Sequence, residues 1–493
     1  MAAQQSPPGL ACALGIDLGT TSVKAALVVA GETGPVVAES CSRETGARAD
    51  SPAAGPQGTE QDVQRIIRAV NECLAALPQQ QLQRVSRVGI SGQMHGVVFW
   101  KRNQGCSWTE SGTGSTWEPA AVSHLVTWQD SRCSCSFLSS LPQPQSHISL
   151  ATGFGCATIF WYLKNNPDFL KSYDAAGTIH DYVVAMLCGL EKPLMSVQNA
   201  ASWGYFSSRS KSWNTEILRE SGFPIHLLPE VGDPGVVAGR MSRGWHGIPK
   251  GAEVGLALGD FQCSVYSCLA ERSDAVLNIS TSAQLTVSMP CGFQPAETPD
   301  SSSSVTYFPY FDGHYLAVAA SLNGGNVLAM FVNMLGQWIA ELGLEVLEST
   351  LYTRTIKAAL AQRDTGLSIC PTVFGERHEP EQLASVTGIA ASDLSLGHVT
   401  RGFRVQTAYP LAFGKAFPSS CSSTHLSAQT CLFFRTVHCE RSRQQLTLLK
   451  SWIVLNDFIT QVLIFPDEHQ ELSLRLDCSA ALIAHEPCHP SWE

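Results

Sequence analysis

A strand–turn–strand pattern occurs twice in this 493-residue chain, and this repeat limits the possible folds more than any other feature. The first copy joins the apolar run 14–17 to the β-rich segment 23–29, and the second joins 275–279 to 283–287. Both turns are rich in glycine, serine or threonine, which favour tight hairpins over helices. Two such hairpins, one in each half of a chain, can face each other and hold one ligand between them.

The two turns have the composition of anion-binding loops, in which backbone N–H groups and hydroxyls point at phosphate oxygens. Asp17 ends the first strand and can hold Mg²⁺ directly or through water, while Lys24 can reach a γ-phosphate as a point charge. A purely structural turn is the alternative for each hairpin taken alone. The pair together favours a nucleotide clamp between two domains. The sequence has no G-x-x-x-x-G-K-[ST] or G-x-G-x-x-G motif, which removes the main support for P-loop and Rossmann sites.

Composition indicates a large globular protein. The length fits about two to four domains, and 44% hydrophobic residues with 15% charged residues can bury a large core. The net charge of −10 comes without a basic run, which argues against nucleic acid as a partner. We expect no membrane segment, because the longest apolar tract, 452–465, is interrupted by Asn456 and Asp457 and is shorter than about 20 residues.

The cysteines predict a reducing environment. The 17 cysteines are scattered along the chain without a Cys-x-x-Cys spacing, so neither a zinc ribbon nor a thioredoxin-like site is indicated. The first residues lack the basic start and apolar core of a secretory signal. We therefore expect free thiols and a cytoplasmic location.

Alternation of strands and helices predicts an α/β protein. Apolar residues at helical spacing predict a helix within 61–77 and mostly helices over 147–205, while 85–91 reads as a strand. We interpret 31–60 as a long loop and 101–120 as a surface excursion, because both segments are rich in glycine and small polar residues.

Six motifs occur along the chain in one order: Gly15–Lys24, Gly92–Gly96, Trp128–Arg132, His180–Tyr182, Leu258–Asp260 and Gly375–Arg377. Together they resemble the FGGY family of carbohydrate kinases, and the resemblance runs from about Leu14 to about Arg401. It implies a two-domain actin-like (ribonuclease H-like) ATPase fold with an interdomain cleft. Residues 10–258 would form a sugar-binding domain with the first phosphate loop, 259–402 part of a nucleotide-binding domain, and 403–493 a divergent tail.

The resemblance implies a catalytic role for Asp260 as the general base that takes the proton from the attacking sugar hydroxyl. Its position also makes chemical sense, because a carboxylate that follows a strand and Gly259 lies at the rim of a sheet, where a hydroxyl can approach to about 3 Å. The alternative is that Asp260 caps a helix beginning at Phe261.

The resemblance also implies a ketose pocket lined by Met94, His95, Trp128, Asp130, Arg132 and Gln262. An aromatic face such as that of Trp128 packs on the C–H surface of a sugar, and a carboxylate accepts hydroxyl protons. For His95 the alternative is a satisfied structural histidine. For Arg132 the alternative is a structural ion pair with Asp130.

ATP and Mg²⁺ are the expected cofactors of a protein with this resemblance. Thr20, Thr21 and Thr281 would contact phosphates, together with Lys24, and Asp17 would serve the metal. Gly324 and Gly325 precede an apolar run and fit a helix N-terminus that approaches the nucleotide closely; a simple glycine turn is the alternative.

The segment 403–493 departs from the family, whose members continue with a glycine-rich unit that packs on adenine. We therefore expect an incomplete second domain and ATP binding weaker by roughly a hundredfold, because the apolar wall for the adenine ring is missing. A replaced C-terminus, from alternative splicing or a changed reading frame, is our interpretation.

The expected activity is ATP-dependent phosphorylation of a seven-carbon ketose at its terminal hydroxyl. Another ketose such as xylulose is a close alternative, because the family shares its pocket motifs. A non-catalytic sugar-binding or regulatory protein is a second alternative, and a chaperone-like ATPase with the same hairpin clamp is a third. The 92–96 and 128–132 segments disfavour the last, since such an ATPase needs no sugar pocket.

Overall fold

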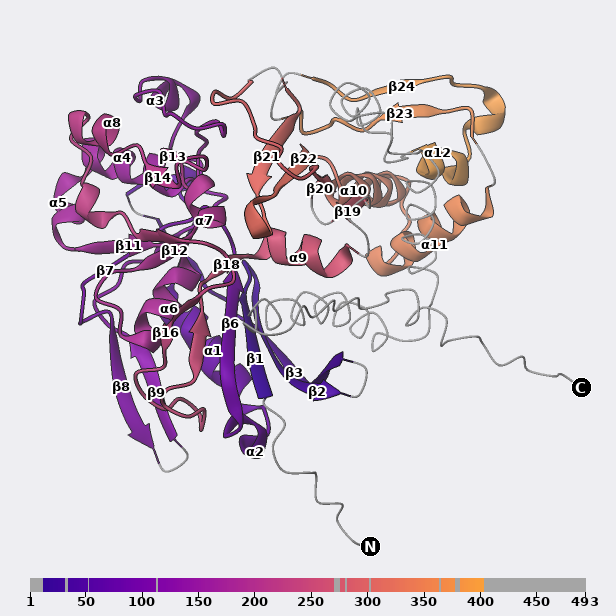
Figure 1. The fold of residues 1–493 in the computed structure, drawn as a ribbon. Coiled ribbons are helices and arrows are strands. Elements are labelled where there is room, and N and C mark those ends of the chain that lie inside the picture. The colour runs from indigo at the N-terminus through magenta and orange to yellow at the C-terminus, as the bar shows by residue number, and fades with distance from the viewer. Residues whose placement is uncertain are drawn as a thin grey trace, which may run out of the picture.

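Two main β-sheets organise the chain, one before and one after residue 259 (Figure 1). The computed structural model describes residues 12–31, 34–51, 53–111, 114–269, 275–279, 282–300, 303–362, 365–376 and 382–402. We refer to the described residues up to 259 as the first half and to those from 260 as the second half. The predicted α/β class is confirmed.

The larger sheet has the strand order β16-β17-β6-β1-β2-β3, with β18 also paired to β6. Strand β6 runs parallel to β1, β17 and β18, whereas β1, β2 and β3 are antiparallel neighbours. All but one of the residues of β1 are buried, as expected for a strand covered on both faces. The strands are β1 (Cys12–Leu18), β2 (Ser22–Gly31), β3 (Gly34–Glu44), β6 (Val85–Gly92), β16 (Val237–Arg240), β17 (Glu253–Gly255) and β18 (Leu258–Gly259).

The register of three parallel strands brings the predicted motifs to one edge. Leu18 of β1 lies beside Gly92 of β6, and Gly92 lies beside Gly259 of β18. Because neighbouring strands are about 4.8 Å apart, the segments that leave the sheet after these three residues start within about 10 Å of one another. The first turn, the 92–96 motif and Asp260 therefore begin at the same sheet edge.

Helices pack on this sheet and complete the first core. Helix α1 (Val63–Ala75) packs on β2 and β3, and α6 (Ile179–Cys188) packs on β6, β16 and β17. The predicted helix within 61–77 is thus confirmed. It begins after Asp62, whose carboxylate accepts a hydrogen bond from the Gln64 amide at 2.8 Å.

A second apolar core lies beside the first, in the helical region predicted for 147–205. Strands β7 and β11 pair with each other and contribute to it, as do several short helices. Its elements and the small ones around it are β7 (Val98–Trp100), β10 (Leu125–Val126), β11 (Ala175–Gly177), β12 (Leu194–Ser196), β13 (Phe206–Ser207), β14 (Ser212–Trp213), β15 (Glu230–Gly232), α3 (Cys135–Ser139), α4 (Gly155–Asn165), α5 (Pro167–Lys171), α7 (Val197–Ala201) and α8 (Thr215–Glu220).

The two segments that we interpreted as a long loop and as a surface excursion contain strands. The segment 31–60 holds β3, the short strand β4 (Arg48–Ala49) and the start of β5 (Glu60–Gln61). The segment 101–120 forms the hairpin of β8 (Cys106–Ser111) and β9 (Gly114–Pro119), in which Trp117 is fully buried. The interpretation of 31–60 as a loop was wrong because its strands are fixed by their partners, and their many small polar residues hide the alternation of a half-buried strand. The segment 101–120 is a regular hairpin, and most of its described residues are exposed or half-buried, as a surface excursion requires.

The second half consists of a four-stranded antiparallel sheet, in the order β19-β20-β22-β21, and helices to its side (Figure 1). The predicted second hairpin is confirmed as β19 and β20. The elements are α9 (Asp260–Cys268), β19 (Ala275–Ile279), β20 (Ala283–Ser288), β21 (Val305–Pro309), β22 (Tyr315–Ser321), α10 (Gly325–Glu341), α11 (Glu348–Ala361), β23 (Ser368–Cys370), β24 (Ser385–Thr387) and α12 (Leu396–Gly402). The predicted tail, 403–493, lies outside the described residues.

Polar contacts join the two halves near β21 and β22. His147 donates from Nε2 to the Tyr307 carbonyl at 2.8 Å, and the hydroxyls of Ser208 and Tyr315 are 2.8 Å apart. Phe308 packs against the second core of the first half. Among the described helices, none combines the length and apolar character needed to cross a bilayer.

Candidate active site

The first turn is a short hairpin loop with Asp17 at its base. The Gly19 amide donates to the Ser22 carbonyl at 3.1 Å, which closes the turn. The Asp17 carboxylate accepts a hydrogen bond from Ser91 at 3.0 Å and lies 3.7 Å from the Lys24 ammonium. Burial raises the pKa of Asp17, and the Lys24 charge and the Ser91 hydrogen bond oppose this rise.

The residues around Asp17 fit Mg²⁺ held through water. One carboxylate at the base of a phosphate loop suffices when the nucleotide supplies further oxygens. Direct binding by Asp17 would compete with Lys24 and Ser91, which already contact its two oxygens. Among the residues that the structure describes, no group of three or more histidine, cysteine or acidic side chains is placed to hold a metal ion.

Thr20 and Thr21 occupy the tip of this turn, and both are tied to the first half through their backbones. The Thr20 carbonyl accepts from Gln61 Nε2 at 2.7 Å, and its hydroxyl accepts from Trp128 Nε1 at 3.1 Å. The Thr21 carbonyl accepts from the Thr45 amide at 2.9 Å, while Thr21 itself is exposed. Thr21 is therefore accessible to solvent at the tip of the loop.

Asp260 is the first residue of α9 and follows β18 directly. Gly259 is the N-cap residue, so the expected alternative, in which Asp260 itself caps the helix, is not what the structure has. The Asp260 carboxylate accepts from the Phe261 amide at 2.7 Å, and Asp260 is half-buried. A helix N-terminus stabilises the ionised carboxylate, which is the form that accepts a proton.

Met94 and Gln262 lie beside Gly259, next to Asp260. A Cβ on Gly259 would meet Gln262 Oε1 at 2.5 Å and Met94 Sδ at 2.6 Å, so any side chain at this position would have to displace the ends of both. Gln262 is fully buried and donates to the Pro309 carbonyl at 3.4 Å, while its Oε1 is unpaired among the described residues. An unpaired buried oxygen is costly and is available to a hydroxyl donor.

His95 is held in a strained backbone conformation, with φ at 70°. Non-glycine residues rarely adopt positive φ, and such strain is frequent at functional sites. The His95 ring stacks on Phe154, with centroids 4.7 Å apart, and its Nδ1 lies 2.9 Å from the Ser202 carbonyl. The neighbouring groups therefore fix the direction of the imidazole.

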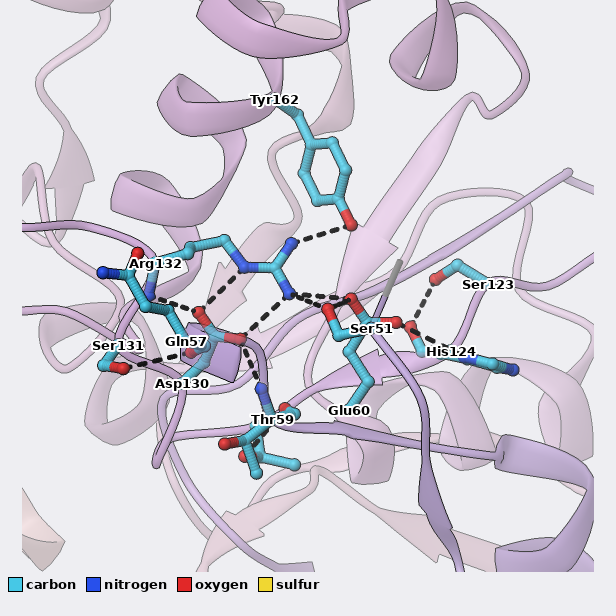
Figure 2. A network of polar contacts seen from close by, with 11 residues as sticks. Ser51, Gln57, Thr59, Glu60, Ser123, His124, Asp130, Ser131, Arg132 and Tyr162 are labelled. Carbon is cyan, nitrogen blue, oxygen red and sulfur yellow. Dashed lines mark hydrogen bonds and ion pairs between the residues drawn. The ribbon is translucent and has the colours of Figure 1, made fainter. Parts of the chain in front are cut away.

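Arg132 lies at the centre of a buried polar network (Figure 2). Its Nε and Nη2 donate to the two oxygens of Asp130 at 2.8 and 2.9 Å, and Nη2 also donates to Glu60 at 2.7 Å. Nη1 donates to the Tyr162 hydroxyl at 2.9 Å. Burial alone would lower the pKa of Arg132, but the hydrogen bonds to Asp130 and Glu60 and the charge of Asp130 hold it above its ordinary value.

The ion pair between Arg132 and Asp130 is the alternative that the sequence left open. Both side chains are buried, and each guanidinium nitrogen has a protein partner. The second oxygen of Asp130 also accepts from the Thr59 amide at 2.8 Å, which joins the 128–132 segment to β5. This network fixes the backbone beside Trp128, and a direct sugar contact by Asp130 or Arg132 stays a prediction.

Trp128 is exposed, with 37% of its surface accessible, as are Gln129 and Ser131 of the same motif. Its indole donates to Thr20, so one side of the predicted sugar pocket touches the predicted phosphate loop. Sequence reasoning missed the polar residues that link these segments, which are Glu60, Gln61, Ser91 and Gln93. Only Gln93 carried a signal, because it belongs to the 92–96 motif.

Gly324, one of the residues predicted to contact the nucleotide, is the N-cap of α10. A Cβ on Gly324 would lie 2.4 Å from the Ser282 carbonyl carbon, so the two segments approach more closely than any side chain allows. Glu376 accepts from the Ser321 hydroxyl at 2.5 Å and from the Asn323 side chain at 3.1 Å, and this holds the loop before Gly325. Thr281 and Arg377 lie outside the described residues.

Comparisons with known proteins agree with the resemblance that the six motifs carry. The model of the FGGY family of carbohydrate kinases, N-terminal domain, matches residues 12–265. Sedoheptulokinase from Homo sapiens is 69% identical over 393 residues, which cover 79% of this chain and 82% of that protein. Sedoheptulokinase from Mus musculus is 68% identical over 391 residues, with the same two coverages of 79% and 82%.

Solved structures agree on the fold. The xylulose kinase from Rhodospirillum rubrum matches with a TM-score of 0.64 and 17% sequence identity, over 79% of this chain and 75% of that one. The gluconate kinase from Lactobacillus acidophilus matches with a TM-score of 0.59 and 18% identity, over 80% and 75%. The expected actin-like fold of sugar kinases is thereby confirmed.

Proposed function

Because this chain belongs to the FGGY family of carbohydrate kinases, we propose that it transfers the γ-phosphate of ATP to sedoheptulose and forms sedoheptulose 7-phosphate. The identity of 69% to a sedoheptulokinase supports this substrate. The observation that carries the proposal is the register of β1, β6 and β18, from which the first turn, Met94 and Asp260 leave one sheet edge. We place the reaction in the cytoplasm, since scattered thiols are typical of proteins from reducing compartments.

Asp260 acts as the general base in this proposal. Its carboxylate accepts the proton of the sugar's terminal hydroxyl while that oxygen attacks the γ-phosphorus. The bond between the γ-phosphorus and the bridging oxygen breaks, and ADP leaves with the bonding electron pair. The position of Asp260 at the N-terminus of α9 supports the role, because the ionised form is favoured before the transfer.

The first turn and Lys24 hold the phosphates. In this proposal the exposed Thr21 and the N–H groups of the turn donate to phosphate oxygens, and Lys24 adds a positive charge at the base of the loop. Asp17 would hold Mg²⁺ through water, and the ion would neutralise part of the charge of the phosphates. Phosphoryl transfer asks mainly for such alignment and charge stabilisation.

Met94, His95 and Gln262 orient the ketose. The unpaired Oε1 of Gln262 accepts from a sugar hydroxyl, and Met94 forms an apolar wall beside it. Trp128 supplies an exposed aromatic face for the C–H surface of the sugar. The sugar thus binds between the end of β6 and the start of α9, which is next to Asp260.

An ADP-release assay over a panel of ketoses, with xylulose among them, tests the substrate. We expect turnover to be fastest with sedoheptulose, and equal rates across the panel would contradict the narrower proposal. In Asp260→Asn we expect turnover to fall by at least a thousandfold while calorimetry still detects ketose binding. Full activity of this variant would exclude Asp260 as the base.

A further inference from the structure

The buried glutamine Gln61 connects the phosphate loop to the sugar loop, although neither motif contains it. Its Nε2 donates to the Thr20 carbonyl at 2.7 Å, and its Oε1 accepts from Gln93 Nε2 at 2.9 Å. Gln93 directly precedes Met94, and its backbone amide donates to the Leu18 carbonyl at 3.0 Å. One side chain therefore bridges two segments that are far apart in sequence.

The direction of this bridge is fixed by chemistry. A backbone carbonyl can only accept, so the Gln61 amide must turn its Nε2 toward Thr20. The Oε1 of Gln61 then faces Gln93, which must present its own Nε2. A carboxylate at position 61 would place an acceptor against the Thr20 carbonyl, which is also an acceptor. The hydrogen bond from residue 61 to Thr20 would then be lost.

The backbone of Gln61 is held on both sides. It pairs in β5 with Arg48 of β4 and with Leu125 of β10. The preceding residue, Glu60, accepts from Arg132 at 2.7 Å and from Ser51 at 2.6 Å. Gln61 is only 7% exposed, so its side chain has little freedom to leave the bridge.

We infer that Gln61 is a positioning residue, which holds the Thr20 turn at a fixed place relative to the sugar loop and so aligns the γ-phosphate with the ketose. The indole of Trp128, which donates to the Thr20 hydroxyl, is a second link from the sugar side to the same residue. This inference rests on the proposed function. It adds a residue that touches neither substrate but acts through Thr20 and Gln93.

The physical consequence concerns alignment more than sugar binding. Without the Gln61 amide, the Thr20 carbonyl loses its side-chain donor, and the turn is free to shift relative to Met94. A misplacement of about 1 Å between reacting groups can cost about a hundredfold in rate. The sugar loop keeps its bond from Gln93 to Leu18, so ketose binding alone should change little.

The test compares Gln61→Met, which keeps the size but removes both hydrogen bonds, with Gln64→Met, a matched change at an exposed residue of α1. We expect Gln61→Met to lower kcat about 10- to 100-fold and to weaken Mg-ATP binding about tenfold in calorimetry. Its ketose Kd without nucleotide should stay within about threefold of the wild type. Gln64→Met should match the wild type in all three measurements.

Gln93→Met should reproduce the loss, and the double variant should be no worse than either single one, because both changes break the same bridge. Unchanged kcat and ATP affinity in Gln61→Met would overturn the inference. So would a loss of ketose binding and of thermal stability together, since that indicates a general structural role. If the wild type phosphorylates no ketose, the proposed function fails, and the ATP affinity of Gln61→Met still decides the role of Gln61.

Discussion

Gly92 at the end of β6 lies directly against the buried ring of His180 on α6. A Cβ at Gly92 would meet His180 Nδ1 at 2.9 Å and Leu18 Cβ at 3.0 Å. His180 Nε2 lies 2.7 Å from the Asn199 side-chain nitrogen, which also donates to the Ala257 carbonyl at 3.4 Å. His180 therefore supports the end of β6, and Asn199 supports the segment just before β18. The proposed site begins where these two strands end.

Gly92→Ala should disturb this contact. Overpacking of a dense site costs about 1–3 kcal/mol, so we expect a lower free energy of unfolding in urea and a higher ketose KM. Gly244→Ala is the matched control, because its Cβ would approach only the Ile248 carbonyl, at 3.3 Å. Equal stability of the two variants would contradict the close fit of Gly92 against His180.

Two neighbouring residues of α6 should give opposite pH dependences of stability. Burial lowers the pKa of His180 from 6.5 to about 3, although the Asn199 hydrogen bond opposes this. The folded state then binds fewer protons than the unfolded state below pH 6.5, so stability falls as the pH is lowered. Burial raises the pKa of Asp181 from 3.8 to about 7 against the Thr178 hydrogen bonds, so stability falls as the pH rises toward 7.

Asp181→Asn and His180→Asn separate these two effects, which oppose each other between about pH 4 and 6.5. We expect the unfolding free energy of Asp181→Asn to rise with pH more steeply than that of the wild type, and that of His180→Asn to fall. Each group contributes at most about 1.4 kcal/mol per pH unit. Urea unfolding at several pH values measures the slopes, and parallel curves for all three proteins would contradict the assignment.

Gly153→Ala should move Trp128. Gly153 has a φ of 79°, and its Cβ would lie 2.3 Å from the Trp128 carbonyl oxygen. We expect a rise of about tenfold in the ketose KM, because the indole leaves the sugar side of Thr20. Gly222→Ala is a close control, since its φ of 73° carries similar strain while nothing lies within 4 Å of its Cβ. This control should lose stability without a change in KM.

Sequence patterns predicted those parts of the fold that depend on local signals. The hairpin of β1 and β2 has an apolar run, a glycine turn and a second β-rich run, and α1 has apolar residues at helical spacing after Asp62. The strand β3 could not be predicted in this way. Its small polar residues become a strand because they pair with β2 across a bulge between Leu27 and Val28.

The candidate site likewise contains residues that local sequence patterns predicted and residues that they did not. Asp17 lies near the end of β1, while Met94 and Asp260 follow β6 and β18, so the strand register brings all three to one edge without further information. The contacts of Gln61 and Glu60 could not be predicted, because their hydrogen-bond partners are distant in the sequence. Two residues that precede a helix also have no typical sequence pattern of their own. The spacing of the 128–132 motif does not show whether Arg132 pairs with Asp130 or faces a sugar, because this depends on how deeply the two side chains are buried.

Arg132→Lys should cost much stability. A lysine keeps the charge but lacks the planar guanidinium group, which donates hydrogen bonds to Asp130, Glu60 and Tyr162 at the same time. Leaving buried carboxylates without their partner typically costs about 3–5 kcal/mol. Arg209→Lys, in an exposed pair with Glu297, should cost less than about 1 kcal/mol in the same urea unfolding experiment. A small loss in both variants would contradict the importance of the buried network.

Gly324→Ala should weaken nucleotide binding. Its Cβ would lie 2.4 Å from the Ser282 carbonyl carbon, so the loop before α10 must move away from the β19–β20 hairpin. We expect the KM for ATP to rise at least tenfold while the ketose Kd without nucleotide is unchanged.

Gly336→Ala places the same substitution inside α10, where the Cβ meets only Leu351 Cδ1 at 3.4 Å. It should raise the free energy of unfolding by about 0.5–1 kcal/mol and leave the KM for ATP as it is. If Gly324→Ala kept its ATP KM, the nucleotide would have to bind elsewhere than at the start of α10.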